Sequence, residues 1–194
     1  MIYILDANVL ISAQELFYPI AHVPEFWRFV AHHASAGAFK MPEEVFREVT
    51  PEDAVLKKWL KEHKSALVLQ DDGYYGHLER VIDEYAPDLN EVEIARLGRD
   101  PFLIAAGVET RGTVVTREIS KPSKKRANRL VPDVCDALGV NWINDHQLIR
   151  LMNFRTRRFS LTGFSGQGEV SGGKPSWEGR TQLVTLIGNR RPEP

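Results

Sequence analysis

Two carboxylate residues follow the two clearest strand signals of the sequence. Asp6 comes directly after the apolar run 2–5, and Glu118 comes just past the β-branched run 113–116. Ligands of parallel α/β sheets collect outside the carboxyl ends of the strands. Both side chains are therefore expected at one edge of a sheet, where carboxylates can bind a cation.

Two further carboxylates belong to segments that the topology can bring to the same edge. Asp100 precedes an apolar helix expected over 102–108, which it is also placed to cap. Glu48 lies on a helix expected over 43–49, after a second short strand. Acidic residues from widely separated segments can thus meet at one site.

The available ligand types indicate Mg²⁺ or Mn²⁺. The chain has one cysteine, and its six histidines show no metal-binding spacing near the acids, so a zinc cage is excluded. A divalent ion held by carboxylates orients a phosphate and lowers the pKa of a bound water, which is the chemistry of phosphodiester hydrolysis. We expect Asp6 and Asp100 as direct ligands. Glu118 would bind directly or through water, and Glu48 would be an outer ligand or the general base.

Each of these acids also has a purely structural interpretation. Asp6 and Asp100 can be helix N-caps, and Glu48 can be a surface residue of its helix. Capping does not explain why Glu118 ends the best strand, so the metal site is favoured. A phosphatase of the haloacid-dehalogenase type is disfavoured, because its nucleophile motif is Asp-x-Asp and the second position here is Asn8.

A basic segment follows Glu118 directly. It contains no acid between residues 121 and 129. Lysine and arginine contacts to phosphates give sequence-independent affinity for nucleic acid, so this loop is predicted to hold RNA phosphates rather than to be merely solvated. The candidate phosphate-binding residues are Lys121, Lys124, Lys125, Arg126 and Arg129.

Strand and helix signals alternate through residues 1–154. This alternation predicts an α/β fold, a three-layer α/β/α sandwich with a mainly parallel central sheet. Strands are expected at 2–5, 39–41, 67–69, 113–116 and 140–143. Residues 155–194 are basic and rich in glycine, which predicts a flexible tail.

The near-neutral composition hides a charge asymmetry. Among 25 Lys+Arg and 26 Asp+Glu, residues 1–100 hold 18 acids and 10 bases, and residues 101–194 hold 8 acids and 15 bases. The basic half indicates a polyanion partner, with a solvated face as the alternative. We expect no membrane association and a cytoplasmic location, because no apolar run approaches ~18 residues and the first residues resemble no leader.

The order of these segments resembles the PIN domain over about residues 1–150. The matching pieces are Asp6-Ala7-Asn8 after an apolar strand, Val45-x-x-Glu48, Asp100-Pro101-Phe102-Leu103-Ile104, and Val114-Val115-Thr116-x-Glu118. The resemblance implies a Mg²⁺-dependent ribonuclease of compact α/β/α fold. Many bacterial PIN proteins are VapC-type toxins neutralised by an antitoxin, so the toxin of such a pair is a further expectation.

The resemblance also implies roles for individual residues. The four acids, in chain order, correspond to the first to fourth acids of the family, and Asn8 and Thr116 match polar positions that order ligands and water. The segment Val131-Pro132-Asp133-Val134-Cys135 resembles a PIN-like subgroup of unassigned function, in which a further acid follows the fourth. Asp133 is therefore a fifth candidate metal ligand.

Two departures from the family pattern matter. Glu118 stands where an aspartate is commoner, and its longer side chain favours water-mediated binding. Glu44 and Glu48 share one helix face, and the spacing from Val45 favours Glu48. The predicted function is RNA cleavage, with an antitoxin or a second copy of the chain as further partners. The alternative is an RNA-binding or regulatory PIN-like module that does not cut.

Overall fold

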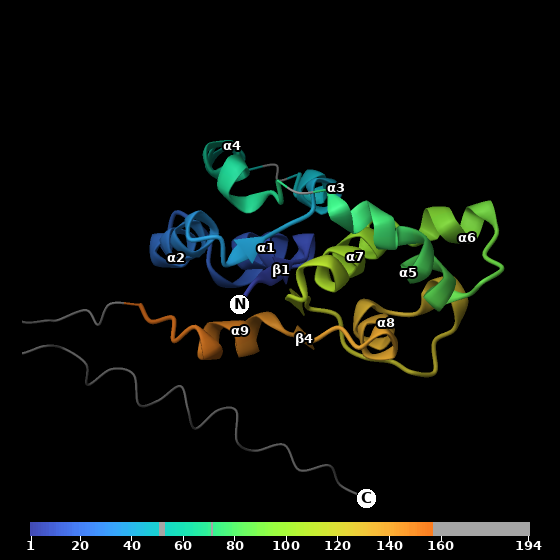
Figure 1. Ribbon diagram of the computed structural model, residues 1–194. Helices are drawn as coiled ribbons and strands as arrows, with labels where there is room; N and C mark the ends of the chain where they lie inside the picture. The colour runs from blue at the N-terminus through green and yellow to red at the C-terminus, as the bar shows by residue number, and fades with distance from the viewer. Residues whose placement is uncertain (51–52, 71, 157–194) are drawn as a thin grey trace, which may run out of the picture. The chain divides into compact units, whose positions relative to one another are not determined.

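A four-stranded, all-parallel sheet organises the protein, which a computed structural model describes over residues 1–156 except 51–52 and 71. Its strands lie in the order β2-β1-β3-β4 (Figure 1). They are β1 (Tyr3–Leu5), β2 (Phe39–Lys40), β3 (Thr113–Val115) and β4 (Trp142–Ile143). The predicted α/β class and parallel sheet are confirmed. From residue 157 on, the predicted tail lies outside the described residues.

Helices fill the connections between these strands. The α-helices are α1 (Ala7–Ser12), α2 (Pro24–Ser35), α3 (Glu43–Glu48), α4 (Ala54–Leu67), α5 (Leu78–Tyr85), α6 (Glu91–Arg96), α7 (Asp100–Thr110), α8 (Val131–Leu138) and α9 (Asp145–Leu151). A π-helical turn, η1 (Ala13–Phe17), and two 3₁₀ turns, η2 (Gly73–His77) and η3 (Arg126–Asn128), complete the described elements. The strand predicted at 67–69 is reduced to one bridge between Met41 and Val68, because α4 continues through Leu67.

Helices cover both faces of the sheet. The connection from β1 to β2 runs in one direction along the sheet, and the connections from β2 to β3 and from β3 to β4 run in the opposite direction. Because crossovers between parallel strands are right-handed, the helices of the first connection and those of the later two lie on opposite faces. On one face α5, α7 and α8 pack against one another. On the other, side chains of α1, α2 and α9 meet around Leu10, Phe26 and Leu148. Figure 1 shows α2 and α9 to the left of the sheet and α5, α7 and α8 to its right.

Helix α7 fixes the edge of the sheet where the candidate acids lie. Leu103, Ile104, Ala105 and Ala106 are all buried, and α7 packs on both central strands, β1 and β3. The helix precedes β3 and runs back across the sheet, so its first residue, Asp100, lies at the carboxyl edge. The apolar face of α7 thereby holds a charged residue in place.

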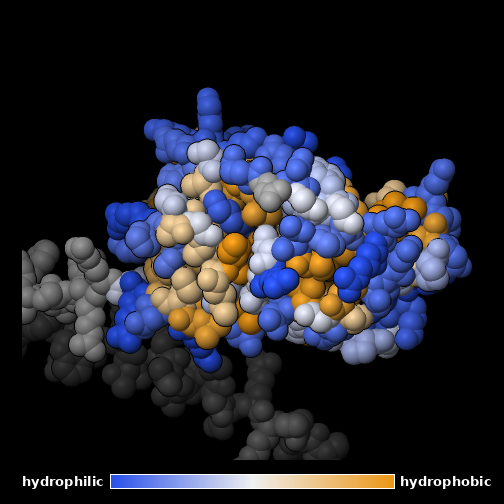
Figure 2. Space-filling model, viewed as in Figure 1, coloured by the Kyte–Doolittle hydropathy of each residue, from blue (hydrophilic) through white to orange (hydrophobic). Residues whose placement is uncertain are grey.

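Helix α6 differs from the other helices because none of its side chains is buried. Val92 and Ile94 are exposed, and Figure 2 shows this hydrophobic surface over α6. Within the described residues, no helix combines the length and apolar character that crossing a membrane requires.

Close packing of α7 on the sheet predicts a steric effect at Gly107. A Cβ added there would lie 2.8 Å from Val114 Cγ2 and 2.9 Å from Val140 Cγ1, so Gly107→Ala should destabilise the protein by about 1–3 kcal/mol. Denaturant unfolding measures this loss. Gly76→Ala is the matched control, because a Cβ there meets nothing within 4 Å, and an equal effect of the two substitutions would contradict the packing described.

Candidate functional site

Asp6 is held at the carboxyl edge of the two central strands. It follows β1 and caps α1, its Oδ1 accepting a 3.3 Å hydrogen bond from the Asn8 backbone N–H. Its Oδ2 accepts hydrogen bonds from Thr116 Oγ1 at 2.7 Å and from Asn8 Nδ2 at 2.6 Å. The cap and the candidate site are therefore the same carboxylate, and Asn8 and Thr116 orient it.

The four predicted acids influence one another electrostatically. The pKa of Asp6, which is 8% exposed, is raised to about 6. Burial is the largest cause, hydrogen bonds from Thr116 and Asn8 oppose it, and the negative charges of Glu118 and Glu48 add to it. Burial raises the pKa of Asp100 to about 8, with added contributions from Glu118, Asp6 and Glu48. Carboxylates from four separate segments therefore lie within electrostatic range of one another. We call these four residues, Asp6, Glu48, Asp100 and Glu118, the acidic group.

The expected capping role of Asp100 is not seen. Helix α7 begins at Asp100 itself, its capping residue is Arg99, and no side-chain hydrogen bond closes the cap. The prediction that Asp100 caps this helix was wrong. Its carboxylate is thus not committed to the helix end.

Glu48 and Glu44, one helical turn apart on α3, have different surroundings. Glu44 accepts hydrogen bonds from the hydroxyls of Tyr74, at 3.0 Å, and Tyr75. The negative charge of Glu48 raises the pKa of both Asp6 and Asp100. The pKa of Glu48 itself is raised by partial burial, and the positive charge of Arg99 opposes that rise. Of the two, Glu48 is the one that the structure brings to the acidic group.

Glu118 joins the two ends of the basic loop by a hydrogen bond. Its backbone N–H donates to Thr116 Oγ1 at 3.2 Å, and its Oε2 accepts a 2.7 Å hydrogen bond from the Val131 N–H at the start of α8. The loop between these residues therefore leaves from and returns to the acidic group. One carboxylate oxygen remains outside this hydrogen bond, which leaves Glu118 able to bind a further ligand.

The side chain of Asp133 forms its hydrogen bonds with the start of the basic loop. Its Oδ1 accepts from Ser120 Oγ at 2.5 Å, and its Oδ2 accepts from the Lys121 N–H at 3.0 Å. Both oxygens thus order the start of the basic loop. Asp133 is not among the groups whose charge raises the pKa of Asp6 or Asp100.

The five cations of the loop divide into two kinds. Arg126 pairs with Glu93 and Asp88, and Arg129 pairs with Glu84. These guanidinium groups fasten the loop to α5, α6 and the turn between them. The side chains left exposed to solvent are those of Lys121, Lys124 and Lys125.

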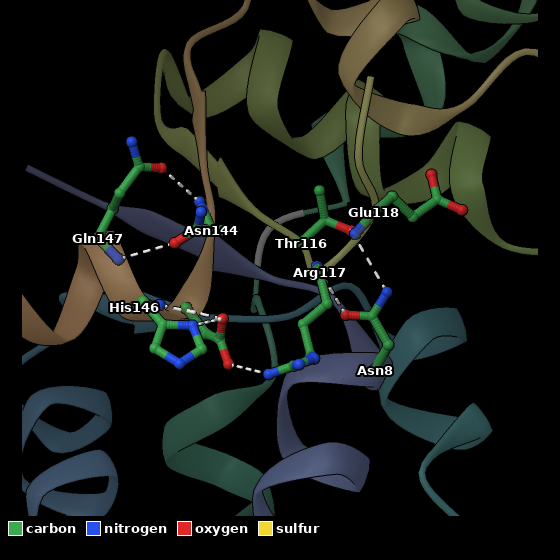
Figure 3. A network of polar contacts seen from close by, with 8 residues as sticks. Asn8, Thr116, Arg117, Glu118, Asn144, His146 and Gln147 are labelled. Atoms are coloured by element: carbon green, nitrogen blue, oxygen red, sulfur yellow. Dashed lines mark hydrogen bonds and ion pairs between the residues drawn. The ribbon is translucent and has the colours of Figure 1, made fainter. Parts of the chain in front are cut away.

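Arg117 points away from the acidic group. Figure 3 shows its side chain and that of Glu118 leaving the chain in opposite directions. Its guanidinium pairs with Asp145 and lies 4.5 Å from the centre of the Phe17 ring, while its backbone N–H donates to Asn8 Oδ1 at 3.1 Å. Arg117 therefore ties the end of β3 to the start of α9 and to α1, and it supports Asn8 from the opposite side.

The donor set suits a hard divalent cation. In the described part of the chain, no three or more His, Cys, Asp or Glu side chains are placed to hold a metal ion together. Mg²⁺ keeps several waters and needs only one or two direct carboxylates. An ion at these acids would therefore be bound partly through water. A cation here would also neutralise carboxylates that now repel one another.

Two buried side chains that the sequence did not single out also face this group. The charges of Asp100 and Glu118 raise the pKa of both Tyr85 and Cys135, in addition to burial, which is the larger cause for each. No local pattern distinguishes these residues from ordinary core positions. Only the packing of α5 and α8 against α7 brings them to the acids.

The raised pKa values predict a stability that falls with pH in the absence of metal. Both native carboxyls hold their protons above the ordinary value of 3.8, up to about 6 for Asp6 and about 8 for Asp100, so the unfolded chain gives up protons first. The melting temperature in EDTA should therefore decrease from about pH 5 to pH 8. Asp100→Asn should flatten that decrease and raise the melting temperature at pH 8. A variant that follows the wild-type pH curve would contradict this.

Comparison with protein families gives one match over most of the chain. Residues 3–156 match the domain of unknown function DUF4411, and this range includes every candidate acid and the whole basic loop. No curated protein matches the sequence. Because the matched range is far more than half of the 194 residues, the chain belongs to the DUF4411 family.

Proposed function

We propose that the protein is a metal-dependent endoribonuclease of PIN type. The observation that carries this proposal is the convergence of Asp6, Glu48, Asp100 and Glu118 at the carboxyl edge of a parallel sheet, where two of them have strongly raised pKa values. Gathering like charges costs stability and serves no packing purpose. Ionisable groups perturbed in this way are typical of functional sites.

In this proposal three of the acids bind the cation and the fourth accepts a proton. Asp6, Asp100 and Glu118 would hold Mg²⁺ or Mn²⁺, in part through water, with Asn8 and Thr116 fixing the orientation of Asp6. The bound cation supplies charge neutralisation of the phosphate and a lowered pKa for the attacking water. Glu48, whose side chain is exposed, would accept a proton from that water.

The exposed lysines of the basic loop support a nucleic acid as the substrate. The hydrogen bond between Glu118 and Val131 joins both ends of the loop to the acidic group, and the side chains of Lys121, Lys124 and Lys125 are exposed along it. Lysine contacts position a phosphate backbone without reading its sequence. Arg126 and Arg129 are left out of this role, because acids of α5, α6 and the turn between them already neutralise them.

The proposal predicts RNA cleavage that requires both a divalent cation and the central aspartates. Asp6→Asn and Asp100→Asn should each lower kcat by at least about 100-fold, since each removes a charged ligand, and EDTA should abolish activity. Asp136→Asn is the matched control, because Asp136 is exposed on α8 and bonds Trp142 Nε1. The measurement is cleavage of single-stranded RNA with Mg²⁺ or Mn²⁺.

The same assay separates cleavage from simple binding. RNA that binds with a steep salt dependence but is left intact with either metal would favour the non-catalytic RNA-binding module instead. Equal cleavage by the wild type and both aspartate variants would contradict a metal site at these residues.

The role of Glu48 can be tested by substituting Glu48 and Glu44 separately, because both lie on α3. Glu48→Gln should lower kcat by about 100- to 10,000-fold with little change in KM, because general-base catalysis contributes to the chemical step. Glu44→Gln, which disturbs only the bonds from Tyr74 and Tyr75, should keep near wild-type kcat. The reverse result would assign the second acid to Glu44.

The PIN resemblance extends the proposal to a toxin controlled by an antitoxin. A groove of about 470 Å³ beside Glu48 is lined by apolar residues of α5, α6 and α7, among them Ile82, Ile94 and Phe102. A protein partner bound there would cover the exposed apolar side chains next to the acids. Growth arrest by the wild-type chain, and its loss with Asp6→Asn, is the corresponding result in cells.

A further inference from the structure

Tyr85, the last residue of α5, has a buried hydroxyl without a partner. The residue is 3% exposed, and among the described residues no group forms a hydrogen bond with its Oη. Native proteins pair nearly all buried polar groups, with protein or with ordered water. An oxygen in this position therefore marks a place where a small polar ligand belongs.

Several contacts bring the end of α5, where Tyr85 lies, to the elements that carry Asp100 and Glu118. Arg129 binds the Glu84 carboxylate and donates to the Asp133 carbonyl at 3.0 Å, which joins the end of α5 to the first turn of α8. The Val131 N–H at the same turn holds Glu118. Helix α5 also packs on α7, which begins with Asp100.

The chemistry of the neighbours defines the missing partner. Burial and the negative charges of Asp100 and Glu118 raise the pKa of Tyr85, so its hydroxyl stays protonated and acts as a donor. Carboxylates are acceptors. A water molecule matches both sides, because it accepts one hydrogen bond from the hydroxyl and donates two to the carboxylates. Three hydrogen bonds is the usual number for a buried water.

We propose that Tyr85 is a positioning residue of the acidic site, whose hydroxyl donates a hydrogen bond to a buried water that bridges Asp100 and Glu118. The water keeps these two carboxylates at a fixed separation from the inner side, while Thr116 and Asn8 orient Asp6. The inference deepens the proposed function, because it assigns a further residue to the same site. Its structural part does not require that RNA be cleaved.

The test is Tyr85→Phe, which keeps the ring and removes only the oxygen. If the hydroxyl has no partner, its removal should raise the melting temperature in EDTA by about 2–6 °C, and this result would overturn the proposal. If the hydroxyl holds a water, the melting temperature should stay the same or fall. Tyr74→Phe is the matched control, because Tyr74 is equally buried and its hydroxyl has a protein partner, Glu44.

A second readout follows the cation rather than activity. Calorimetric titration with Mn²⁺ should show about 10-fold weaker binding to Tyr85→Phe than to Tyr74→Phe, because groups that orient metal ligands affect affinity to this extent. Equal affinity of the two variants would overturn the positioning role.

A crystal structure of the wild-type chain separates this proposal from the proposed function. Water density within about 3 Å of Tyr85 Oη, Asp100 and Glu118 supports the proposal, and a protein group bonded to Oη overturns it. Even if the wild-type chain fails to cleave RNA, the water density and the melting temperatures still test whether Tyr85 binds this water. Failure to cleave would remove the ribonuclease alone.

Discussion

The burial of carboxylates beside one another at the end of two paired strands is the constraint on which this site depends. Asp6 follows β1 and is bonded by Thr116, which follows β3, so the pairing of the two central strands sets the position of its carboxylate. Asp100 comes to the same edge on α7. Holding these charges together requires stabilisation elsewhere, and the buried apolar faces of α7 and of the central strands provide it.

Each acid is fixed by a different local device. Asp6 uses a helix cap and two side-chain donors, Glu118 uses the N–H at the start of α8, and Asp100 uses the packing of the helix that it begins. Asp100, which lacks a capping hydrogen bond, has the more strongly raised pKa of the two aspartates. Hydrogen bonding lowers a carboxyl pKa, so the donors on Asp6 make it more readily ionised than Asp100, although burial raises the pKa of both.

The sequence predicted the parallel sheet and the arrival of Asp6 and Glu118 at its edge, because both depend on strand periodicity and the geometry of parallel α/β sheets. It could not predict how side chains pair after the chain has folded. Asp133 has the residue type of a ligand, yet both its oxygens bond the loop 120–121. Tyr85 carries no signal at all, since a tyrosine on an apolar helix face looks like any core residue until its hydroxyl is found buried without a partner among the described residues.

The charge asymmetry between the two halves of the chain is partly resolved inside the protein. Acids of the first half, Glu84, Asp88 and Glu93, pair with Arg126 and Arg129 of the second. Individually such exposed pairs add little stability, but together they hold the basic loop against α5 and α6. The arginines are thereby used to place the lysines. In the proposed function, a loop fixed in this way would present its lysines to a phosphate backbone, while Glu118 at the base of the loop belongs to the carboxylates that would bind the cation.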